Sequence, residues 1–414
     1  MSSALQPQRV ISGLKELRAL TGDENGAQRV AFTPTWAKAR AWLREKLKAL
    51  PVEVHTDAAG NLWATLRGRS EKELLIGGHI DSVPNGGWLD GALDTLAGLE
   101  ILQRLIAQYD GKPPVTVRLV DWADEEGARF GKSLFGSSAC SGTLNLPEAA
   151  KLMDRDGIRL PDVLKEHGIV FENVKDAGQE LKNAAAYLEL HIEQGPVLLD
   201  LDLPLGVVLG TFGVERHAIT FHGQAAHSGS TPMNRRKDAF LAAAKMSPYI
   251  YQLAQQHGGV CTIGSCTTKP GIVTSVVEEC HITLDQRHLD AAALGKMLAE
   301  ARDASRKFAE EGNLEVTWER LFQIKPRPFH HDLIVLCEEA IRETCGQSHR
   351  LPSGPLHDAA EMAAAGVPTV MMFVQSLRGI SHNKIEDTRE EHLELAVRAL
   401  DNLADKLMAW VLER

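Results

Sequence analysis

Seven histidine and carboxylate side chains follow predicted strands or open a predicted helix, where α/β proteins usually bind their ligands. They are His79, Asp81, Asp90, Glu125, Glu126, His191 and His382. Imidazole and carboxylate groups together, without a thiolate, suit a divalent zinc, manganese, cobalt or nickel ion. These residue types therefore predict a metal centre, which could activate water for hydrolysis.

The number of candidate ligands predicts two ions rather than one. Three histidines and two or three carboxylates exceed what one tetrahedral site uses, so two ions that share a carboxylate are the simpler interpretation. Asp90 is the best shared ligand, because the turn at residues 88–91 lets a short side chain lie between two ions. Glu125 and Glu126 would point to opposite sides of an extended chain, so that one binds metal and the other acts as a base.

Asp81 has a different predicted role. Its side chain lies two residues from His79 and would point the same way on an extended backbone. A carboxylate there can accept the second ring N–H of a metal-binding histidine and so fix the orientation of the ring. We therefore expect Asp81 to orient His79.

Short buried strands alternate with amphipathic helices in the parts of the chain that carry these residues. Predicted strands cover residues 62–66, 74–79, 115–122, 187–192 and 369–374, and predicted helices cover 10–20, 35–50, 90–108, 332–345 and 390–412. This order predicts an α/β fold with a mostly parallel sheet and helices on both faces. Since the carboxyl ends of parallel strands meet at one edge, we expect the candidate ligands to converge there.

The middle of the chain follows another pattern, in which strands alternate between apolar and polar residues. The predicted order is strand 217–222, helix 237–256, strand 272–284 and helix 287–311. Half-buried strands of this kind predict a small α+β domain inserted into the larger one. Gly210 and a proline-containing segment at residues 325–328 interrupt the pattern on either side. We expect a catalytic metal-binding domain of residues 1–208 and 327–414 and a lid domain of residues 209–326.

Composition restricts the class of protein. The 414 residues are too many for one compact core, so two domains are expected. A net charge of −10 argues against nucleic acid or an anionic membrane as a partner, because both need a basic surface. Residues 1–20 show no secretory signal, the longest strongly apolar run (367–374) is too short for a membrane span, and the six cysteines show no CxxC spacing. We expect a cytoplasmic protein that acts on a small molecule.

Five motifs resemble those of one known group of enzymes. They are residues 78–93, the double-glutamate segment 125–130, the His-Ile-Glu-Gln-Gly-Pro-Val-Leu segment 191–198, residues 227–233 and residues 381–383. In this order and spacing they resemble the hydantoinase/carbamoylase group of aminoacylase-type dinuclear zinc hydrolases, which contains N-carbamoyl-L-amino acid hydrolases and allantoate amidohydrolases. The resemblance covers about residues 70 to 390.

The resemblance implies a role for each candidate ligand. One ion would be held by His79, Asp90 and His191, and the other by Asp90, Glu126 and His382. Glu125 would be the general base. Zinc is the expected ion, with manganese, cobalt or nickel as alternatives.

The resemblance also makes the middle domain a lid that forms a two-fold homodimer. His227 of one subunit would reach the active site of the other and act in catalysis. Arg287 would bind the carboxylate of the substrate, and His357 would line the pocket.

Some positions depart from the pattern of the group. Thr274 replaces an asparagine, Val277-Glu278 replaces Pro-Gly, and Pro355-Leu356 replaces Ala-Gly. Asp94 stands where glycine is frequent. Thr274 and Pro355-Leu356 would lie near the substrate, so these departures bear on the identity of the substrate rather than on the chemistry.

We therefore expect a metal-dependent amidohydrolase that cleaves a linear C–N bond of an N-carbamoyl amino acid or a similar small carboxylate. A metallo-dipeptidase, an aminopeptidase or an N-acyl amino acid deacylase would need the same water and base, so the metal ligands leave these alternatives open. Arg287 favours a small acidic substrate over an extended peptide. A metal-binding or assembly protein without catalysis is a further alternative, against which a free base at Glu125 argues.

Overall fold

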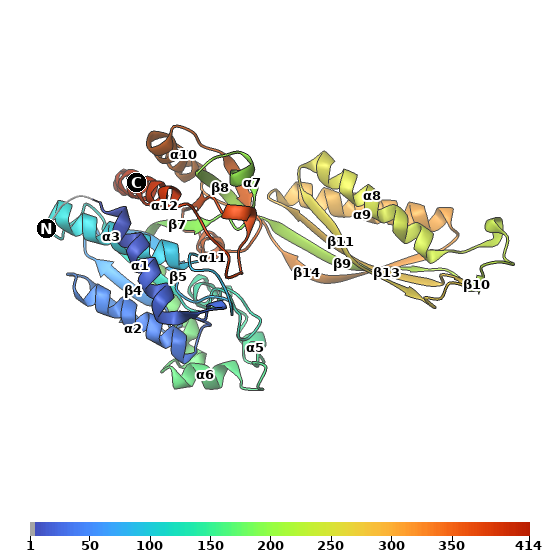
Figure 1. The fold of residues 1–414 in the computed structure, drawn as a ribbon, viewed down its shortest axis with the longest axis horizontal. Helices are drawn as coiled ribbons and strands as arrows, with labels where there is room; N and C mark the ends of the chain where they lie inside the picture. Colours follow the sequence, from blue (N-terminus) through green and yellow to red (C-terminus); the bar gives the residue numbers. More distant parts are fainter. Residues whose placement is uncertain (1–4) are drawn as a thin grey trace. The chain divides into compact units, whose positions relative to one another are not determined.

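The computed structural model describes residues 5–414 and divides into two compact units (Figure 1). One unit runs to Leu209 and resumes at Phe329–Arg414, and the other is Gly210–Pro328. These borders lie one or two residues from the expected ones. The prediction about a secretory signal falls partly on residues 1–4, which lie outside the described residues.

A nine-stranded mixed sheet lies at the centre of the first unit, and only its short edge strand at residues 327–328 and the last two residues of the strand beside it belong to the second unit. Its order is β15 (Arg327–Pro328), β8 (Leu205–Thr211), β17 (Thr369–Val374), β7 (Ala184–Ile192), β5 (Glu73–His79), β6 (Thr116–Trp122), β4 (Leu62–Leu66) and β3 (Glu53–Thr56), with β16 (Arg350–Ser353) paired to β8. The four central strands β17, β7, β5 and β6 are parallel, and the strands toward both edges are antiparallel. The predicted α/β class is confirmed, with a sheet that is parallel at its centre.

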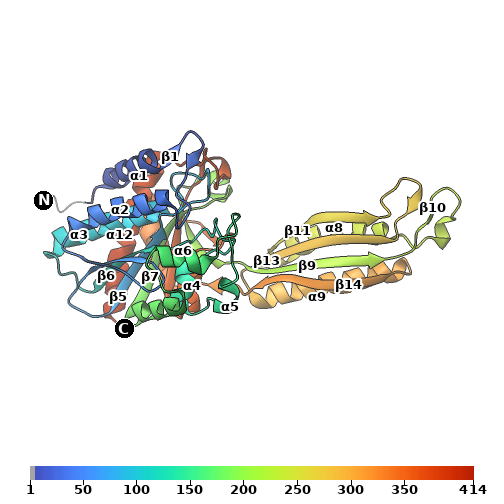
Figure 2. The same ribbon diagram turned by 90° about the horizontal axis from the view of Figure 1, so that it is seen from below.

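Helices pack around this sheet (Figures 1 and 2). They are α1 (Pro7–Thr21), α2 (Pro34–Lys48), α3 (Ala92–Tyr109), α4 (Phe135–Ser141), α5 (Leu146–Ala149), α6 (Leu160–Glu166), η1 (Phe171–Leu181), α7 (Val197–Asp200), α10 (His331–Cys345), α11 (Asp358–Ala364), η3 (Leu377–Gly379) and α12 (Glu390–Leu412), with a small hairpin of β1 (Gly22–Asp23) and β2 (Gly26–Ala27). The strands β5, β6 and β17 are buried along their whole length, which explains their largely apolar sequences. Helix α3 is buried at every residue from Ala92 to Leu102, so it holds the turn before it, at Asp90, against the sheet.

The second unit contains a four-stranded antiparallel sheet and two long helices. The sheet order is β11 (Val260–Lys269), β13 (Glu279–His288), β9 (Gly213–His222) and β14 (Glu315–Ile324), and the helices are α8 (Ala239–His257) and α9 (Ala291–Glu311). A two-stranded ladder of β10 (Ala226–His227) and β12 (Ser275–Val276) and the short helix η2 (Met233–Arg235) complete it. Ile219, Phe221, Ile282 and Leu284 form an apolar cluster with the helices, while alternate residues stay partly exposed.

Two predicted elements of this unit are corrected by the structure. The segment predicted as one strand at 272–284 contains β12, a connecting stretch and only then β13. The helix predicted from residue 287 begins at Ala291, because Arg287 still pairs with Val214 in the sheet and the Asp290 side chain caps the helix at Ala293 N. Strands β11 and β14 were not predicted, and both are largely exposed.

None of the helices within residues 5–414 is both long enough and apolar enough to cross a membrane. All six cysteines lie among these residues and are free thiols.

Candidate metal centre

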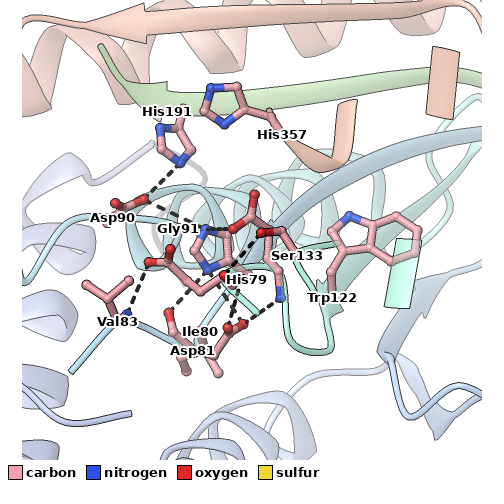
Figure 3. A network of polar contacts seen from close by, with 12 residues as sticks. His79, Ile80, Asp81, Val83, Asp90, Gly91, Trp122, Ser133, His191 and His357 are labelled. Atoms are coloured by element: carbon pink, nitrogen blue, oxygen red, sulfur yellow. Dashed lines mark hydrogen bonds and ion pairs between the residues drawn. The ribbon is translucent and has the colours of Figure 1, made fainter. Parts of the chain in front are cut away.

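The ends of two central strands and the turn before α3 bring His79, His191 and Asp90 together in the first unit (Figure 3). His79 is the last residue of β5. His191 is the last residue but one of β7, and it pairs with Phe373 of β17. Asp90 lies in the turn before α3. Gly91 has a φ of +63°, and a Cβ at this position would lie 2.3 Å from the His79 ring. A glycine is therefore required for the Asp90 turn to lie against this histidine.

Three buried side chains, His79, Asp90 and His191, form what we call the inner triad. The Nε2 atoms of His191 and His79 lie 3.0 Å and 3.8 Å from Asp90 Oδ1. The Nδ1 atoms of both rings contact backbone oxygens, at 3.2 Å to Asp81 for His79 and at 2.8 Å to Ile192 for His191. These contacts leave both Nε2 atoms facing Asp90.

Asp90, Glu126 and His382 form a second group, the outer triad. His382 Nε2 lies 3.5 Å from Asp90 Oδ2 and 3.3 Å from Glu126 Oε2. The two triads therefore use different oxygens of Asp90, as a bridging carboxylate would. The outer triad is less enclosed, since the His382 side chain is 51% exposed.

The histidine nitrogens fit a metal ion. His79 Nε2 is buried and has no hydrogen-bond partner among the described residues. A buried polar atom without a partner is unfavourable, and a divalent ion between His79, Asp90 and His191 would satisfy it. In each triad the candidate ligand atoms lie within 4.8 Å of one another.

Glu125 lies beside the triads and belongs to neither. Its Oε2 is 3.6 Å from His79 Nε2. Asp124 has a left-handed φ of 56°, so the chain turns here instead of continuing extended as predicted. Burial raises the pKa of the Glu125 carboxyl well above its usual value; His79 partly offsets this rise, and Asp358 and Glu126 add to it.

Asp81 holds this turn in place. Its carboxylate accepts the backbone N–H groups of Glu125 and Glu126 at 3.3 Å and 3.2 Å. We expected the His79 ring to donate to the Asp81 carboxylate, but that carboxylate lies 3.6 Å from His79 Nδ1, too far for a hydrogen bond. His79 Nδ1 contacts the backbone oxygen of Asp81 instead. Asp81 therefore orders both the histidine and the double glutamate, through different atoms.

A pocket of about 220 Å³ opens over the triads. It is lined by Asp90, Glu125, Glu126, Ser133, His191, Gln194, Pro355, Leu356, His357 and His382. The His357 ring centroid lies 4.4 Å from that of His191, and its Nε2 contacts Ser353 Oγ at 2.9 Å. Burial lowers the pKa of His357 well below its usual value, and His191 lowers it further, so His357 is a neutral wall residue.

The remaining predicted residues belong to the second unit. His227 pairs with Ser275 in the β10–β12 ladder, and the backbone oxygen of Thr274 accepts Ser228 N at 3.0 Å. Arg287 lies near the end of β13, opposite Val214. Arg287 lies eight positions after Glu279 along β13, a length of about 26 Å. His227 and Thr274 therefore lie together at the β10–β12 ladder, which lies beyond one end of the four-stranded sheet (Figure 1). Arg287 lies near the other end of that sheet.

Several residues of the centre were not predicted from the sequence. Gln194 Nε2 donates to Asp90 Oδ2 at 3.0 Å, and the Ser381 hydroxyl lies 3.0 Å from the same oxygen. Glu386 accepts the backbone N–H of Asp90. Gln194 and Ser381 lie inside motifs that resemble those of the known group, so their place in the sequence could have indicated a role in the site. Glu386 lies outside these motifs, and nothing in the sequence pointed to it.

Comparison with known proteins agrees with this geometry. The model of peptidase family M20/M25/M40 matches residues 75–406. An N-carbamoyl-L-amino acid amidohydrolase from Geobacillus stearothermophilus is 33% identical over 408 residues, covering 96% of this chain and 97% of that protein. An allantoate amidohydrolase from Escherichia coli is 32% identical over 390 residues, covering 93% of each.

A solved structure agrees as well. The crystal structure of an amidase of the hydantoinase/carbamoylase family from Burkholderia multivorans has a TM-score of 0.86 and 30% identity, and covers 98% of this chain and 99% of that one. The predicted resemblance to this group is confirmed, and so is the prediction of a hydrolase of carbon–nitrogen bonds. Because the family match extends over most of the sequence and full-length relatives share about a third of its residues, the chain belongs to peptidase family M20/M25/M40.

Proposed function

We propose that the chain is a metal-dependent amidohydrolase that cleaves the linear C–N bond of an N-carbamoyl (ureido) amino acid or a similar small carboxylate. The observation that carries this proposal is the pair of triads that share Asp90, with Glu125 beside them as an additional buried carboxylate. A storage or assembly site would have no use for that carboxylate. The names of the two relatives, a carbamoylase and an allantoate amidohydrolase, support a ureido substrate.

The inner and outer triads would hold two divalent ions, with Asp90 as the shared ligand. Histidine and carboxylate ligands favour zinc and also accept manganese, cobalt or nickel. When bound, such ions lower the pKa of a water molecule and polarise the scissile carbonyl.

Glu125 is the residue that would move the proton. Because burial raises its pKa, its carboxylate is a better proton acceptor than an exposed glutamate. It would take the proton from water and return it to the leaving nitrogen. Asp81 supports this role by fixing the backbone of Glu125. An N-carbamoyl amino acid plus water would give the amino acid, ammonia and carbon dioxide.

His227 would stabilise the developing oxyanion. Its Nδ1 accepts the backbone N–H groups of Gly229 and Ser230 at 3.0 Å and 3.2 Å. A nitrogen that accepts two hydrogen bonds carries no proton, so in the neutral ring the proton lies on Nε2, at an exposed position. His227 can therefore donate from Nε2.

Arg287 would bind the carboxylate of the substrate. Since about 26 Å of β13 lies between the two ends of the lid sheet, His227 and Arg287 of one lid cannot touch the same small substrate. If both contact one substrate, the two residues must come from different subunits. This separation supports a homodimer in which His227 acts on the partner's active site.

The apolar side chains of Pro355 and Leu356 would face the non-reacting part of the substrate, because both line the pocket. Exposed Thr274 would contact the substrate from the same lid end as His227. These three positions differ from the pattern of the group, so we expect them to restrict which ureido acid is accepted.

A substrate panel tests the proposal. Purified protein loaded with Zn²⁺ or Mn²⁺ is assayed for ammonia release from N-carbamoyl amino acids and allantoate, for amine release from N-acetyl amino acids, and for cleavage of dipeptides. We expect ureido substrates to have the highest kcat/KM. Turnover of dipeptides or N-acetyl amino acids with no ammonia release from any ureido acid would contradict the proposal.

A further inference from the structure

Glu386 connects the two chain segments that carry the ligands of the outer triad. It is 2% exposed. Its Oε1 accepts the backbone N–H groups of Leu89 and Asp90 at 3.2 Å and 3.1 Å, and its Oε2 accepts the hydroxyl of Ser381 at 2.7 Å. One carboxylate therefore fixes both the turn at Asp90 and the residue directly before His382.

The fit around Glu386 is close. A Cβ at Gly87 would lie 2.0 Å from Glu386 Oε1, so the chain before Asp90 can lie this near only as glycine. The next residue makes a parallel contact, since Trp88 Nε1 donates to Asp387 Oδ1 at 3.2 Å. Two successive acidic residues thus hold the segment that leads into Asp90.

Ser381 transmits this contact to the shared ligand. Its Oγ lies 3.0 Å from Asp90 Oδ2, the oxygen that faces His382. A hydroxyl has a single proton to donate. When Ser381 gives that proton to Glu386, it no longer competes with a cation for Asp90 Oδ2, which also accepts a hydrogen bond from Gln194 Nε2.

The outer triad needs such support more than the inner triad does. The three inner ligands are buried and come from β5, β7 and the turn before α3. His382 is half exposed, lies in a loop and has a left-handed φ of 54°. A ligand of this kind has other conformations available and must be held by its neighbours.

We propose that Glu386 and Ser381 are positioning residues that set the affinity of the outer triad for its metal ion, without contacting substrate. The inference rests on the proposed dinuclear centre. Partners of this kind typically change metal affinity by about 10- to 100-fold when they are removed. Although Asp90 belongs to both triads, the inner triad also has two buried histidines, so the effect should fall mainly on the ion of the outer triad.

The test is a Co²⁺ titration of metal-free protein, followed by d–d absorption and by metal analysis after dialysis. The variants are Glu386→Gln, which keeps the shape of the side chain, and Ser381→Ala, which removes only the hydroxyl. The matched control is Asp57→Asn, because Asp57 Oδ1 also accepts two backbone N–H groups, both at 2.9 Å, and does not line the pocket. Thermal unfolding of the metal-free proteins reports whether each variant is folded.

We expect the wild type and Asp57→Asn to bind two Co²⁺ per chain. Both test variants should keep the first ion within about twofold and bind the second about 10- to 100-fold more weakly, with a changed absorption band for the second ion only. Unchanged binding in both folded variants, or equal weakening of both ions, would overturn the proposal. A wild type that binds fewer than two ions would instead overturn the dinuclear centre itself.

Discussion

At the scale of single residues, Glu125 and Glu126 are neighbours in sequence with different surroundings. Glu126 Oε2 faces His382, and its Oε1 accepts the backbone N–H of Val83. Glu125 lies outside both triads and approaches His79. The left-handed backbone at Asp124 turns the chain just before the pair.

Exchange of each glutamate for glutamine should separate binding from proton transfer. We expect Glu125→Gln to keep two ions per chain and to lose at least about 100-fold in kcat, since it removes the base and leaves the triads intact. Glu126→Gln should lose one ion. Metal analysis and steady-state kinetics measure both effects. If Glu125→Gln kept full turnover, the base would have to be another residue.

Arg287 gives a prediction about substrate binding. Its Nε donates to Asp285 Oδ1 at 2.8 Å, and Arg216 Nη2 donates to Asp285 Oδ2 at 2.7 Å. Arg287→Lys should raise KM for a carboxylate substrate by about tenfold, because lysine lacks the planar fork that binds a carboxylate through two N–H groups. Arg216→Lys is the matched control, because it alters a contact with the same aspartate. Equal changes in KM for both variants would argue against a specific role for Arg287.

At the scale of elements, the ion pairs between β9 and β13 predict how the sheet of the second unit responds to acid. Burial raises the pKa of Asp285, but hydrogen bonds from Arg287 and Arg216 outweigh it, so the pKa lies below its usual value. The carboxylate therefore stabilises the folded sheet above the unfolded pKa of about 4, and this contribution is lost as the pH falls through the folded pKa.

Asp285→Asn should accordingly weaken the sheet by about 1 kcal/mol near pH 7 and by much less near pH 3. Hydrogen exchange in peptides from β9 and β13, corrected for the intrinsic rate at each pH, measures this difference. A loss of protection that is the same at both pH values would show that the charge of Asp285 is not the cause.

The elements also show which parts of the fold could be predicted from the sequence pattern. Strand β17 was predicted to the residue because its six side chains are all buried and five of them are apolar. Strands β11 and β14 were missed because edge strands with many exposed residues carry little apolar pattern. The convergence of His79, Asp90 and His191 at one edge of the sheet could be predicted, since parallel strands end at one edge. The bond from Gln194 to Asp90 joins residues 104 positions apart and could not, because no local pattern encodes it.

At the scale of the whole molecule, the length of the lid decides which residues can share a substrate. His227 and Arg287 lie at opposite ends of one sheet, and no motion within a folded strand shortens about 26 Å. An active site that uses both must therefore be built from two chains, and a single chain would be incomplete. If both residues act on one substrate, as we propose, the oligomeric state is part of the chemistry.

Subunit mixing tests this directly. Glu125→Gln and His227→Ala are each expected to be nearly inactive alone, since each lacks one catalytic group in every site. In a mixed dimer, the chain with an intact Glu125 receives an intact His227 from its partner, so one of two sites is complete. Co-expression in equal amounts should restore about a quarter of wild-type activity, because about half of the dimers are mixed. If His227 served its own chain, every site would lack one group and no activity would return.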